Sequence, residues 1–309
     1  MESLRAKQFH DLKPCVLVVD DEVFNLEIIS ELLEDAGYQV VTAENGADAC
    51  ALLQHEPQKF SSVLLDRMMP EMDGMEVMAF MQRDAQLRQI PVIMQTAKAT
   101  KTDIEEGLAA GVLFYITKPF NEDTLLDIVD SAVAGYVNQQ QLSEVVSLQA
   151  QPVNRHGEYR FQTFDEARAM ATVLAHASPN PQRTVIGLAE LLYNAVEHGN
   201  LGIGFAKKTE LLKKGAWMEE IQVRQSLPDN ANKQVIVSVE EQGGEIRYTI
   251  QDQGAGFDSD RYLQIDAARA TCVNGRGIAI ARAVSFDQVE YTDNGSKVVA
   301  IINARQGGA

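Results

Sequence analysis

The first half of the chain alternates short apolar runs with helical patterns. The apolar runs occupy residues 15–19, 39–42, 61–65, 91–94 and 112–116, and helical segments such as 46–55, 74–84 and 100–110 fit between them. Strands that alternate with helices form a parallel sheet covered by helices on both faces. The pattern therefore predicts an α/β domain, whose ligands would lie just beyond the carboxyl ends of the strands.

Polar residues stand where these strands end. Asp20 and Asp21 follow the first run, Asp66 the third, Thr96 the fourth and Lys118 the fifth. Clustered carboxylates favour a hard divalent cation such as Mg²⁺, and a carboxylate beside that ion can attack a phosphoryl group to give an aspartyl phosphate. A lysine and a hydroxyl within reach would contact the added charge. Each residue alone is equally typical of a helix cap or a turn, but all of them at successive strand ends favour a site.

Four segments carry a family resemblance over roughly residues 14–135. VVDDE, LLDRMMPEMDGME, QTAKA and YITKPF resemble the receiver domain of two-component response regulators. The resemblance implies a flavodoxin-like domain with a parallel sheet in the order 2-1-3-4-5. It also implies a sensor histidine kinase as the partner that phosphorylates the domain.

The receiver resemblance implies roles for individual residues. It assigns Asp66, Lys118, Thr96 and Tyr115 to the phosphorylation chemistry, and Asp20, Asp21 and Asp66 to Mg²⁺. Asp66 would be the phosphoacceptor, and Lys118 and Thr96 would contact the phosphoryl group. Tyr115 lies three residues before the lysine and matches the aromatic switch position of the family. Simple packing on an edge strand is the alternative role for Tyr115.

Residues 121–150 have the pattern of a helix that begins at the end of this domain. Leu125, Val129, Ala132 and Tyr136 fall near heptad spacing, so the helix could couple phosphorylation to a homodimer or to the next domain. We favour a last helix packed on its own sheet, followed by a helical extension and linker over 136–157. The second domain would then occupy residues 158–309.

The second half contains a helix that carries Glu and Asn on one face. A capping box at Thr163–Glu166 opens a helix that runs to about His176, and Asn180–Pro181 opens another that runs to His198. In the second helix Glu190 and Asn194 are four residues apart, so both project from one face. A carboxylate can act as a base and an amide oxygen can bind Mg²⁺. A solvated helix face would look the same.

Strands and glycine clusters follow. Residues 234–240 and 245–251 predict a hairpin, and a second hairpin surrounds 293–295. DQGAGF starts at Asp252, where the glycines let the backbone approach a ligand and the carboxylate can accept a hydrogen bond from an amino group. NGRG precedes a helical stretch, an arrangement suited to phosphate binding. By itself, each cluster is more often a turn.

Together these motifs resemble the GHKL, or Bergerat-type, ATP-binding domain over about residues 158–304. ELLYNAVEHGN is similar to the N box, and DQGAGF and NGRGIAIAR to the two glycine boxes. The resemblance implies an α+β two-layer sandwich with a mixed sheet, ATP and Mg²⁺ as cofactors, and Glu190 as the base. It assigns to the nucleotide Asn194, which would also bind Mg²⁺, Asp252, which would recognise adenine, and the loop residues Gly254, Gly256, Gly275, Arg276 and Gly277. The anti-sigma-factor serine kinases are the most similar branch.

Two features depart from the GHKL pattern. Ala279 stands where many relatives have a third glycine, and residues 200–233 form an insertion with two expected short helices. The insertion could dock a partner or cover the nucleotide, with Trp217 as a natural anchor, or it could be a packing elaboration. His198 is expected to be structural.

Length and charge limit the functions. The chain has 309 residues and a formal net charge of −17, from 27 basic and 44 acidic residues. Residues 1–150 carry 10 basic and 25 acidic residues, whereas residues 151–309 carry 17 and 19. The length indicates about two domains, and the charge asymmetry indicates that they differ chemically. The negative charge disfavours nucleic acid as a partner.

Compartment and thiols are read from the same sequence. No apolar stretch reaches the roughly 18 residues of a membrane helix, and the first residues lack the apolar core of a signal peptide. We therefore expect a cytoplasmic protein without a membrane partner. Cys15, Cys50 and Cys272 are widely spaced, which predicts free thiols.

These observations predict a response regulator with a kinase output. Phosphorylation of Asp66 would control an ATP-dependent serine/threonine protein kinase that phosphorylates an anti-sigma-factor antagonist, in partner-switching signalling. The alternative is a non-catalytic switch that sequesters a sigma factor or an antagonist. A hybrid histidine kinase is disfavoured, because the interval from 140 to 158 is too short for a dimerisation domain with a phosphoacceptor histidine.

Overall fold

The structure is a computed structural model that describes residues 13–97, 101–112, 114–148, 153–257 and 275–304. Within these residues the chain divides into two compact units, of which the first ends at Val137 and the second begins at Asn138. Each unit has its own sheet, and each is described by itself.

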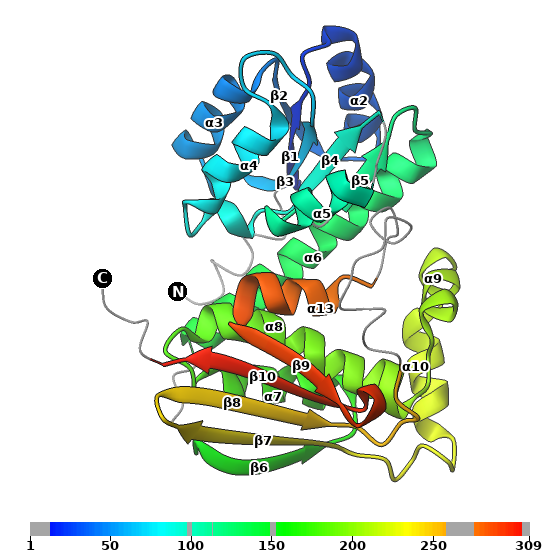
Figure 1. Cartoon of the computed structure of the whole chain (residues 1–309). Coiled ribbons are helices and arrows are strands. Elements are labelled where there is room, and N and C mark those ends of the chain that lie inside the picture. Colours follow the sequence, from blue (N-terminus) through cyan, green and yellow to red (C-terminus); the bar gives the residue numbers. More distant parts are fainter. Residues whose placement is uncertain (1–12, 98–100, 113, 149–152, 258–274, 305–309) are drawn as a thin grey trace. The chain divides into compact units, whose positions relative to one another are not determined.

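The first unit contains a parallel sheet in the order β2-β1-β3-β4-β5 (Figure 1). Its strands are β1 (Cys15–Val19), β2 (Gln39–Ala43), β3 (Phe60–Asp66), β4 (Val92–Thr96) and β5 (Phe114–Thr117). Its helices are α2 (Val23–Asp35), α3 (Gly46–His55), α4 (Gly74–Gln82), α5 (Lys101–Ala109) and the start of α6 (Glu122–Leu148), with a 3-10 turn η1 (Leu87–Gln89). The flavodoxin-like order expected from the sequence is confirmed.

Burial explains this sheet. All five residues of β1 and of β4 are buried, as continuous apolar runs in a parallel sheet require. Helices α2 and α6 cover one face through the core that includes Leu33 and Val129, and α3, α4 and α5 lie on the other (Figure 1). The carboxyl ends of the strands therefore form one edge, where the polar residues gather.

Helix α6 extends past the first unit. Its first half contributes Leu125 and Val129 to the core of the first unit, and its second half contributes Leu142 and Val146 to the core of the second unit. The carbonyl oxygen of Val146 lies 3.1 Å from His176 Nε2. The end of α6 is therefore an integral packing element, which differs from the expected helix on its own sheet followed by a linker.

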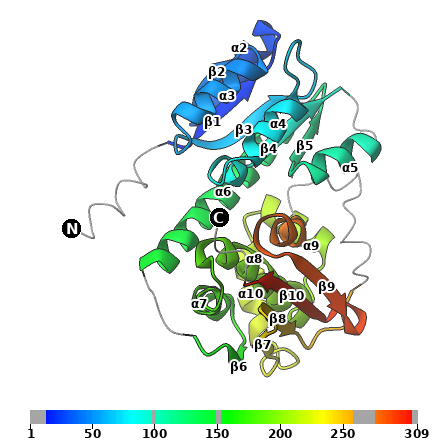
Figure 2. The same cartoon turned by 60° about the vertical axis from the view of Figure 1, so that its left-hand side comes forward.

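The second unit contains a sheet in the order β6-β7-β8-β10-β9 (Figure 2). Its strands are β6 (His156–Phe161), β7 (Val235–Gln242), β8 (Glu245–Gln251), β9 (Gln288–Thr292) and β10 (Lys297–Asn303). Its helical segments are α7 (Phe164–Ala175), α8 (Pro181–Asn194), η2 (Ala195–Asn200), α9 (Phe205–Lys213), α10 (Trp217–Ser226), α13 (Gly277–Ile280), η3 (Ala281–Ser285) and η4 (Asp293–Gly295).

The expected mixed sheet is wrong for the described strands, which all pair antiparallel. Strands β8 and β9 run in the same direction, but β10 lies between them and runs opposite to both. Because β10 lies between them, β8 and β9 do not pair with each other, and each pairs antiparallel with β10. Strand β6, which pairs with the edge of β7, is an element that the sequence did not predict.

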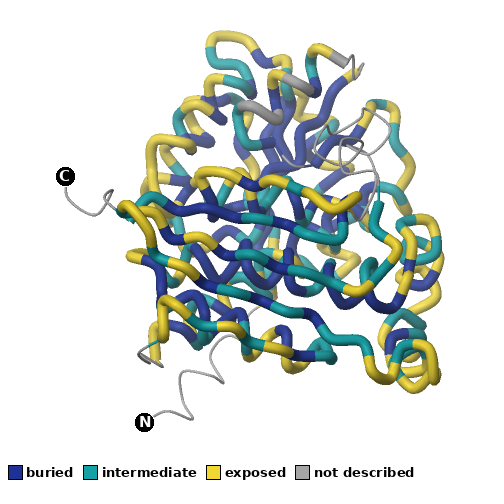
Figure 3. The backbone as a smooth tube through the Cα atoms, turned by 60° about the horizontal axis from the view of Figure 1, so that its bottom comes forward, coloured by how far each residue is buried: buried dark blue, intermediate teal, exposed yellow. Residues whose placement is uncertain are grey.

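Alternating burial makes this sheet one half of a two-layer sandwich. Every second residue of β7 from Val235 to Val239 is fully buried, and β8 alternates in the same way. Figure 3 shows how burial varies along the backbone. Their apolar faces share a core with α7 and α8. The expected capping box at Thr163 and the Asn180 cap are both present.

Two further expectations concern membrane-spanning segments and free thiols. Within the part of the chain that the structure describes, no helix combines the length and the apolar character needed to cross a membrane. Cys15 and Cys50 are buried free thiols. Residues 258–274, which include Cys272, lie outside the described residues.

Candidate functional site

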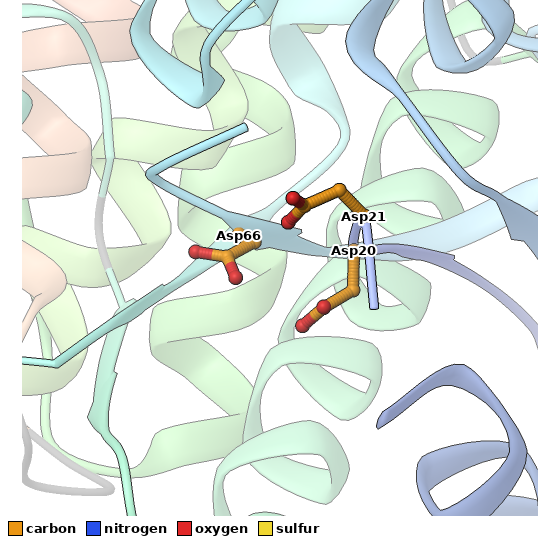
Figure 4. Close-up of side chains that lie close together, drawn as sticks. All are labelled: Asp20, Asp21 and Asp66. Carbon is orange, nitrogen blue, oxygen red and sulfur yellow. The ribbon is translucent and has the colours of Figure 1, made fainter. Parts of the chain in front are cut away.

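Three carboxylates meet at the edge of the first sheet. Asp20 and Asp21 follow β1 and Asp66 ends β3, and each offers an oxygen that lies within 4.8 Å of the others (Figure 4). Asp20 is fully buried and Asp66 is nearly so. Oxygen donors at this spacing fit a hard cation such as Mg²⁺.

Lys118 compensates two of these charges. Its Nζ lies 2.7 Å from Asp20 Oδ2 and 2.5 Å from Asp66 Oδ2. Burial lowers the pKa of the Lys118 ammonium, but the hydrogen bonds to both carboxylates outweigh it and raise that pKa overall. Burial raises the pKa of Asp66 against the hydrogen bond from Lys118. A cation at the third carboxylate would complete the charge balance and keep Asp66 ionised as a nucleophile.

Thr96 and Tyr115 are placed differently. Thr96 is buried at the end of β4, and its carbonyl oxygen accepts a hydrogen bond of 2.8 Å from the Lys118 N–H. Tyr115 is 1% exposed, and its hydroxyl lies against Gly107 of α5. Thr96 is therefore tied to the acidic site through the backbone, and Tyr115 is buried beneath α5.

Arg67 is a residue that the sequence interpretation missed. It directly follows Asp66, and its Nη2 lies 3.0 Å from Asp103 Oδ1 and 3.3 Å from Glu106 Oε2, both on α5. Only its position beside the phosphoacceptor candidate could have drawn attention to it. The ion pairs link the end of β3 to the helix that covers Tyr115.

In the second unit, the second glycine loop lies directly on α8. A Cβ atom on Gly277 would lie 2.3 Å from Glu190 Oε2 and 3.3 Å from Asn194 Nδ2. A side chain at this position would therefore require the Glu190 carboxylate to move. Burial raises the pKa of Glu190, and Lys208 opposes that effect. Glu190, Asn194 and the loop therefore lie together in the structure.

The first glycine segment lies against the end of the same helix. A Cβ atom on Gly254 would lie 2.3 Å from the carbonyl oxygen of Gly199, and one on Gly199 would lie 2.3 Å from Asp252 Cγ. Asn200 Oδ1 accepts a hydrogen bond of 2.7 Å from the Gln253 N–H. Residues 195–200 form a π-helical turn, a feature frequent at functional sites.

The carboxylate of Asp252 is partly buried. Its Oδ1 accepts a hydrogen bond of 2.8 Å from the Gly254 N–H. Burial raises the pKa of Asp252 to about 6, against that hydrogen bond and the charge of Lys233. Asp252 can therefore accept a hydrogen bond from an amino group at neutral pH.

The other loop residues take different positions. Gly256 has a φ of +75°, and its Cα faces the carbonyl oxygen of Asn294 in the turn between β9 and β10. Gly275 has a φ of +88° and lies against the ring of Phe205 on α9. Arg276 is buried at the start of α13. Gly256 thus shapes its own loop, whereas Gly275 meets the insertion.

Residues 200–233 are held against η2 by contacts that the sequence did not reveal. Glu197 is fully buried, and its carboxylate accepts hydrogen bonds from Lys208 Nζ at 2.6 Å and from Trp217 Nε1 at 2.7 Å. The Trp217 ring also packs edge-on against Phe164. Trp217 therefore packs against the core of the second unit. His198 Nδ1 contacts the carbonyl oxygen of Ile203, in keeping with a structural role.

Comparison with known proteins supports the assignment of the first unit as a receiver domain. Residues 16–130 match the response regulator receiver domain family. The protein PilH of Pseudomonas aeruginosa is 38% identical over 120 residues, which make up 39% of this chain and 98% of PilH. The polar-differentiation response regulator DivK of Brucella anthropi is 34% identical over 117 residues, 38% of this chain and 93% of DivK.

A solved structure matches a similar share of the chain. The chemotaxis protein CheY4 of Vibrio cholerae is 34% identical, with a TM-score of 0.37, and the match covers 39% of this chain and 99% of CheY4. The family match includes the positions of Asp20, Asp66 and Lys118.

Proposed function

Because the chain belongs to the response regulator receiver domain family through residues 16–130, we propose that its receiver controls an ATP-dependent serine/threonine protein kinase in the second unit. The kinase is of the anti-sigma type, and its substrate is an anti-sigma-factor antagonist. Receiver domains bind Mg²⁺ in their acidic site and are phosphorylated by sensor histidine kinases. Asp66 is the phosphoacceptor in this proposal, and Lys118 and Thr96 contact the phosphoryl group.

One observation carries the kinase proposal. The loop at Gly277 approaches Glu190 and Asn194 so closely that an added Cβ atom would lie 2.3 Å from the Glu190 carboxylate, which would have to move, and 3.3 Å from the Asn194 amide. Glu190 and Asn194, which precede Gly277 by 87 and 83 residues in the chain, therefore lie directly against the backbone of this loop. Such a cradle beside a carboxylate and an amide suits a magnesium-bound polyphosphate.

The residues of the cradle have separate tasks. When bound, ATP supplies the γ-phosphoryl group. Asn194 holds Mg²⁺, Asp252 accepts a hydrogen bond from the adenine amino group, and the loops around Gly254 and Gly277 approach the nucleotide with their backbone. Glu190 orients the substrate hydroxyl and accepts its proton. Positioning and charge stabilisation supply most of the rate in phosphoryl transfer.

Calorimetry tests this function. Mg²⁺-ATP is titrated into the full chain with the receiver either free or loaded with beryllofluoride. We expect binding that Asn194→Ala weakens at least about tenfold, that Asn303→Ala leaves unchanged, and that differs between the two receiver states. No binding in either state would contradict the kinase proposal.

A non-catalytic switch is the second candidate. Ala279 replaces a glycine near the phosphate loop, and Met218 and Val223 on α10 are 50% and 51% exposed, as on a surface that binds a sigma factor or an antagonist. The variant Glu190→Gln separates the two functions. The kinase requires that this variant bind ATP normally and lose phosphoryl transfer, whereas stoichiometric inhibition of the partner without turnover supports the switch.

A further inference from the structure

Helix α9 of the insertion lies against the second glycine loop. A Cβ atom on Gly275 would lie 2.5 Å from Phe205 Cε2, at the first residue of α9, and one on Gly277 would lie 2.3 Å from Glu190 Oε2. The loop therefore runs between α9 on one side and α8 on the other. Because these contacts involve the residues of the candidate nucleotide site, the insertion is part of the wall of that site.

Lys208 lies on the face of α9 that meets the site. It follows Phe205 by three residues, so the two side chains project from the same face of the helix. Its ammonium lies 2.6 Å from Glu197 Oε2, in the turn that follows Asn194. Burial raises the pKa of Glu190 and the charge of Lys208 opposes that rise, so the ammonium interacts with both carboxylates of this region.

The ammonium retains the capacity to bind a ligand. The Lys208 side chain is 22% exposed, whereas the Glu197 side chain is fully buried. A lysine ammonium has three N–H donors. Among the described residues, Glu197 accepts one hydrogen bond from it. The carboxylate of Glu197 in turn keeps the hydrogen bond from Trp217 Nε1. Lys208 can therefore donate to a second anion without leaving Glu197 unsatisfied.

On the basis of the proposed nucleotide site, we propose that Lys208 binds the terminal phosphate of ATP and that Glu197 positions it. A triphosphate is strongly anionic, and it would enter a region that already holds the carboxylates of Glu190 and Glu197. A cation held at the junction of α9 and the glycine loop offsets this repulsion. The insertion thereby makes the site selective for a nucleoside triphosphate over a diphosphate.

Trp217 provides the probe for a test. It is the single tryptophan of the chain, and Lys208 Nζ lies 5.4 Å from the centre of its ring. Mg²⁺-ATP and Mg²⁺-ADP are titrated into the full chain, with binding followed by calorimetry and by tryptophan emission. We expect ATP to change the emission more than ADP does.

Substitutions separate a phosphate contact from a structural ion pair. Lys208→Ala would leave the buried Glu197 charge without a hydrogen-bond donor, so the comparison uses Lys208→Gln, whose amide N–H can still donate to Glu197 but which carries no positive charge. Lys208→Gln should weaken ATP binding about tenfold and ADP binding less than about threefold. Lys207→Ala, on the exposed side of the same turn and paired with Glu210, is the control and should alter neither.

The outcomes are distinct. An unchanged ratio of ATP to ADP affinity in Lys208→Gln overturns this assignment and leaves the nucleotide site intact. Failure of the unsubstituted chain to bind either nucleotide overturns the proposed site together with it.

Discussion

Tyr115 occupies a space that a glycine leaves open. A Cβ atom on Gly107 of α5 would lie 1.7 Å from Tyr115 Oη. The tyrosine is 1% exposed, its hydroxyl has no hydrogen-bond partner among the described residues, and burial raises its pKa to about 12. Such an unsatisfied hydroxyl costs free energy. The ring can lie in this position because Gly107 has no side chain to collide with the hydroxyl.

Gly107→Ala should displace Tyr115. In a helix, alanine is ordinarily more stable than glycine by about 1 kcal/mol, but overpacking a core typically costs about 1–3 kcal/mol. We therefore expect a net loss of stability in chemical denaturation of the full chain. Tyr115→Phe removes the clashing oxygen, so the double variant should recover most of the loss. Additive effects of the two substitutions would contradict this dependence.

Asp252 should make nucleotide binding depend on pH. The amino group of adenine needs the ionised carboxylate as an acceptor, and the pKa of Asp252 is about 6. ATP affinity should therefore fall as pH drops below about 6, approaching tenfold per pH unit. Calorimetric titrations between pH 5 and pH 7.5 measure this, and Asp252→Asn should lack the Asp252 component that is superimposed on the titration of ATP itself.

The same residue changes stability in the opposite direction. Its pKa is raised from 3.8 in the free side chain to about 6 in the folded chain, so the folded state holds the proton more tightly than the unfolded state. The contribution to stability is complete below pH 3.8 and is lost as pH rises through about 6. Asp252→Asn should therefore stabilise the ligand-free chain near pH 7 relative to the unsubstituted chain.

At the scale of elements, α6 belongs to two cores. Leu142 is 1% exposed and packs in the core of the second unit, although its helix begins in the first unit. Ser143 and Ser147 add hydrogen bonds to Gln182 of α8. The end of the helix is therefore part of the second unit.

Leu142→Ala should destabilise the second unit by about 2–5 kcal/mol, the usual cost of a large-to-small change in a core. Val137→Ala is the control, because Val137 lies on the same helix and is 39% exposed; it should cost less than about 0.5 kcal/mol. Thermal unfolding followed by Trp217 emission, a probe within the second unit, measures both. Equal effects of the two substitutions would show that the end of α6 does not pack as described.

The elements differ in how far the sequence predicted them. Local signals identified the capping box at Thr163 and the Asn180–Pro181 start of α8, because a helix end is set by hydrogen bonds over three or four residues. Strand β6 was missed because its HGEYRF sequence is polar. Its residues alternate between exposed and half-buried, and only the last one, Phe161, is buried. Its stability comes from pairing with β7, far along the chain.

At the scale of the whole molecule, both sites join residues that are distant in the sequence. Lys118 and Asp20 are 98 residues apart, yet both follow strands of one parallel sheet and so reach the same edge. Glu190 and Gly277 meet because α8 and the glycine loop pack around one core. At that edge Lys118 pairs with the carboxylates of both Asp20 and Asp66.

The sequence by itself determined the parallel sheet of the receiver, the strand-end positions of Asp20, Asp66 and Lys118, and most helix limits. These features depend on hydrophobic periodicity and short-range hydrogen bonds, which are written along the chain. Only the tertiary structure decided that β10 separates β8 from β9, that Trp217 packs against the core of the second unit, and that Lys208 stands beside the candidate nucleotide site. Those outcomes depend on which distant surfaces pack together, and no local pattern encodes that choice.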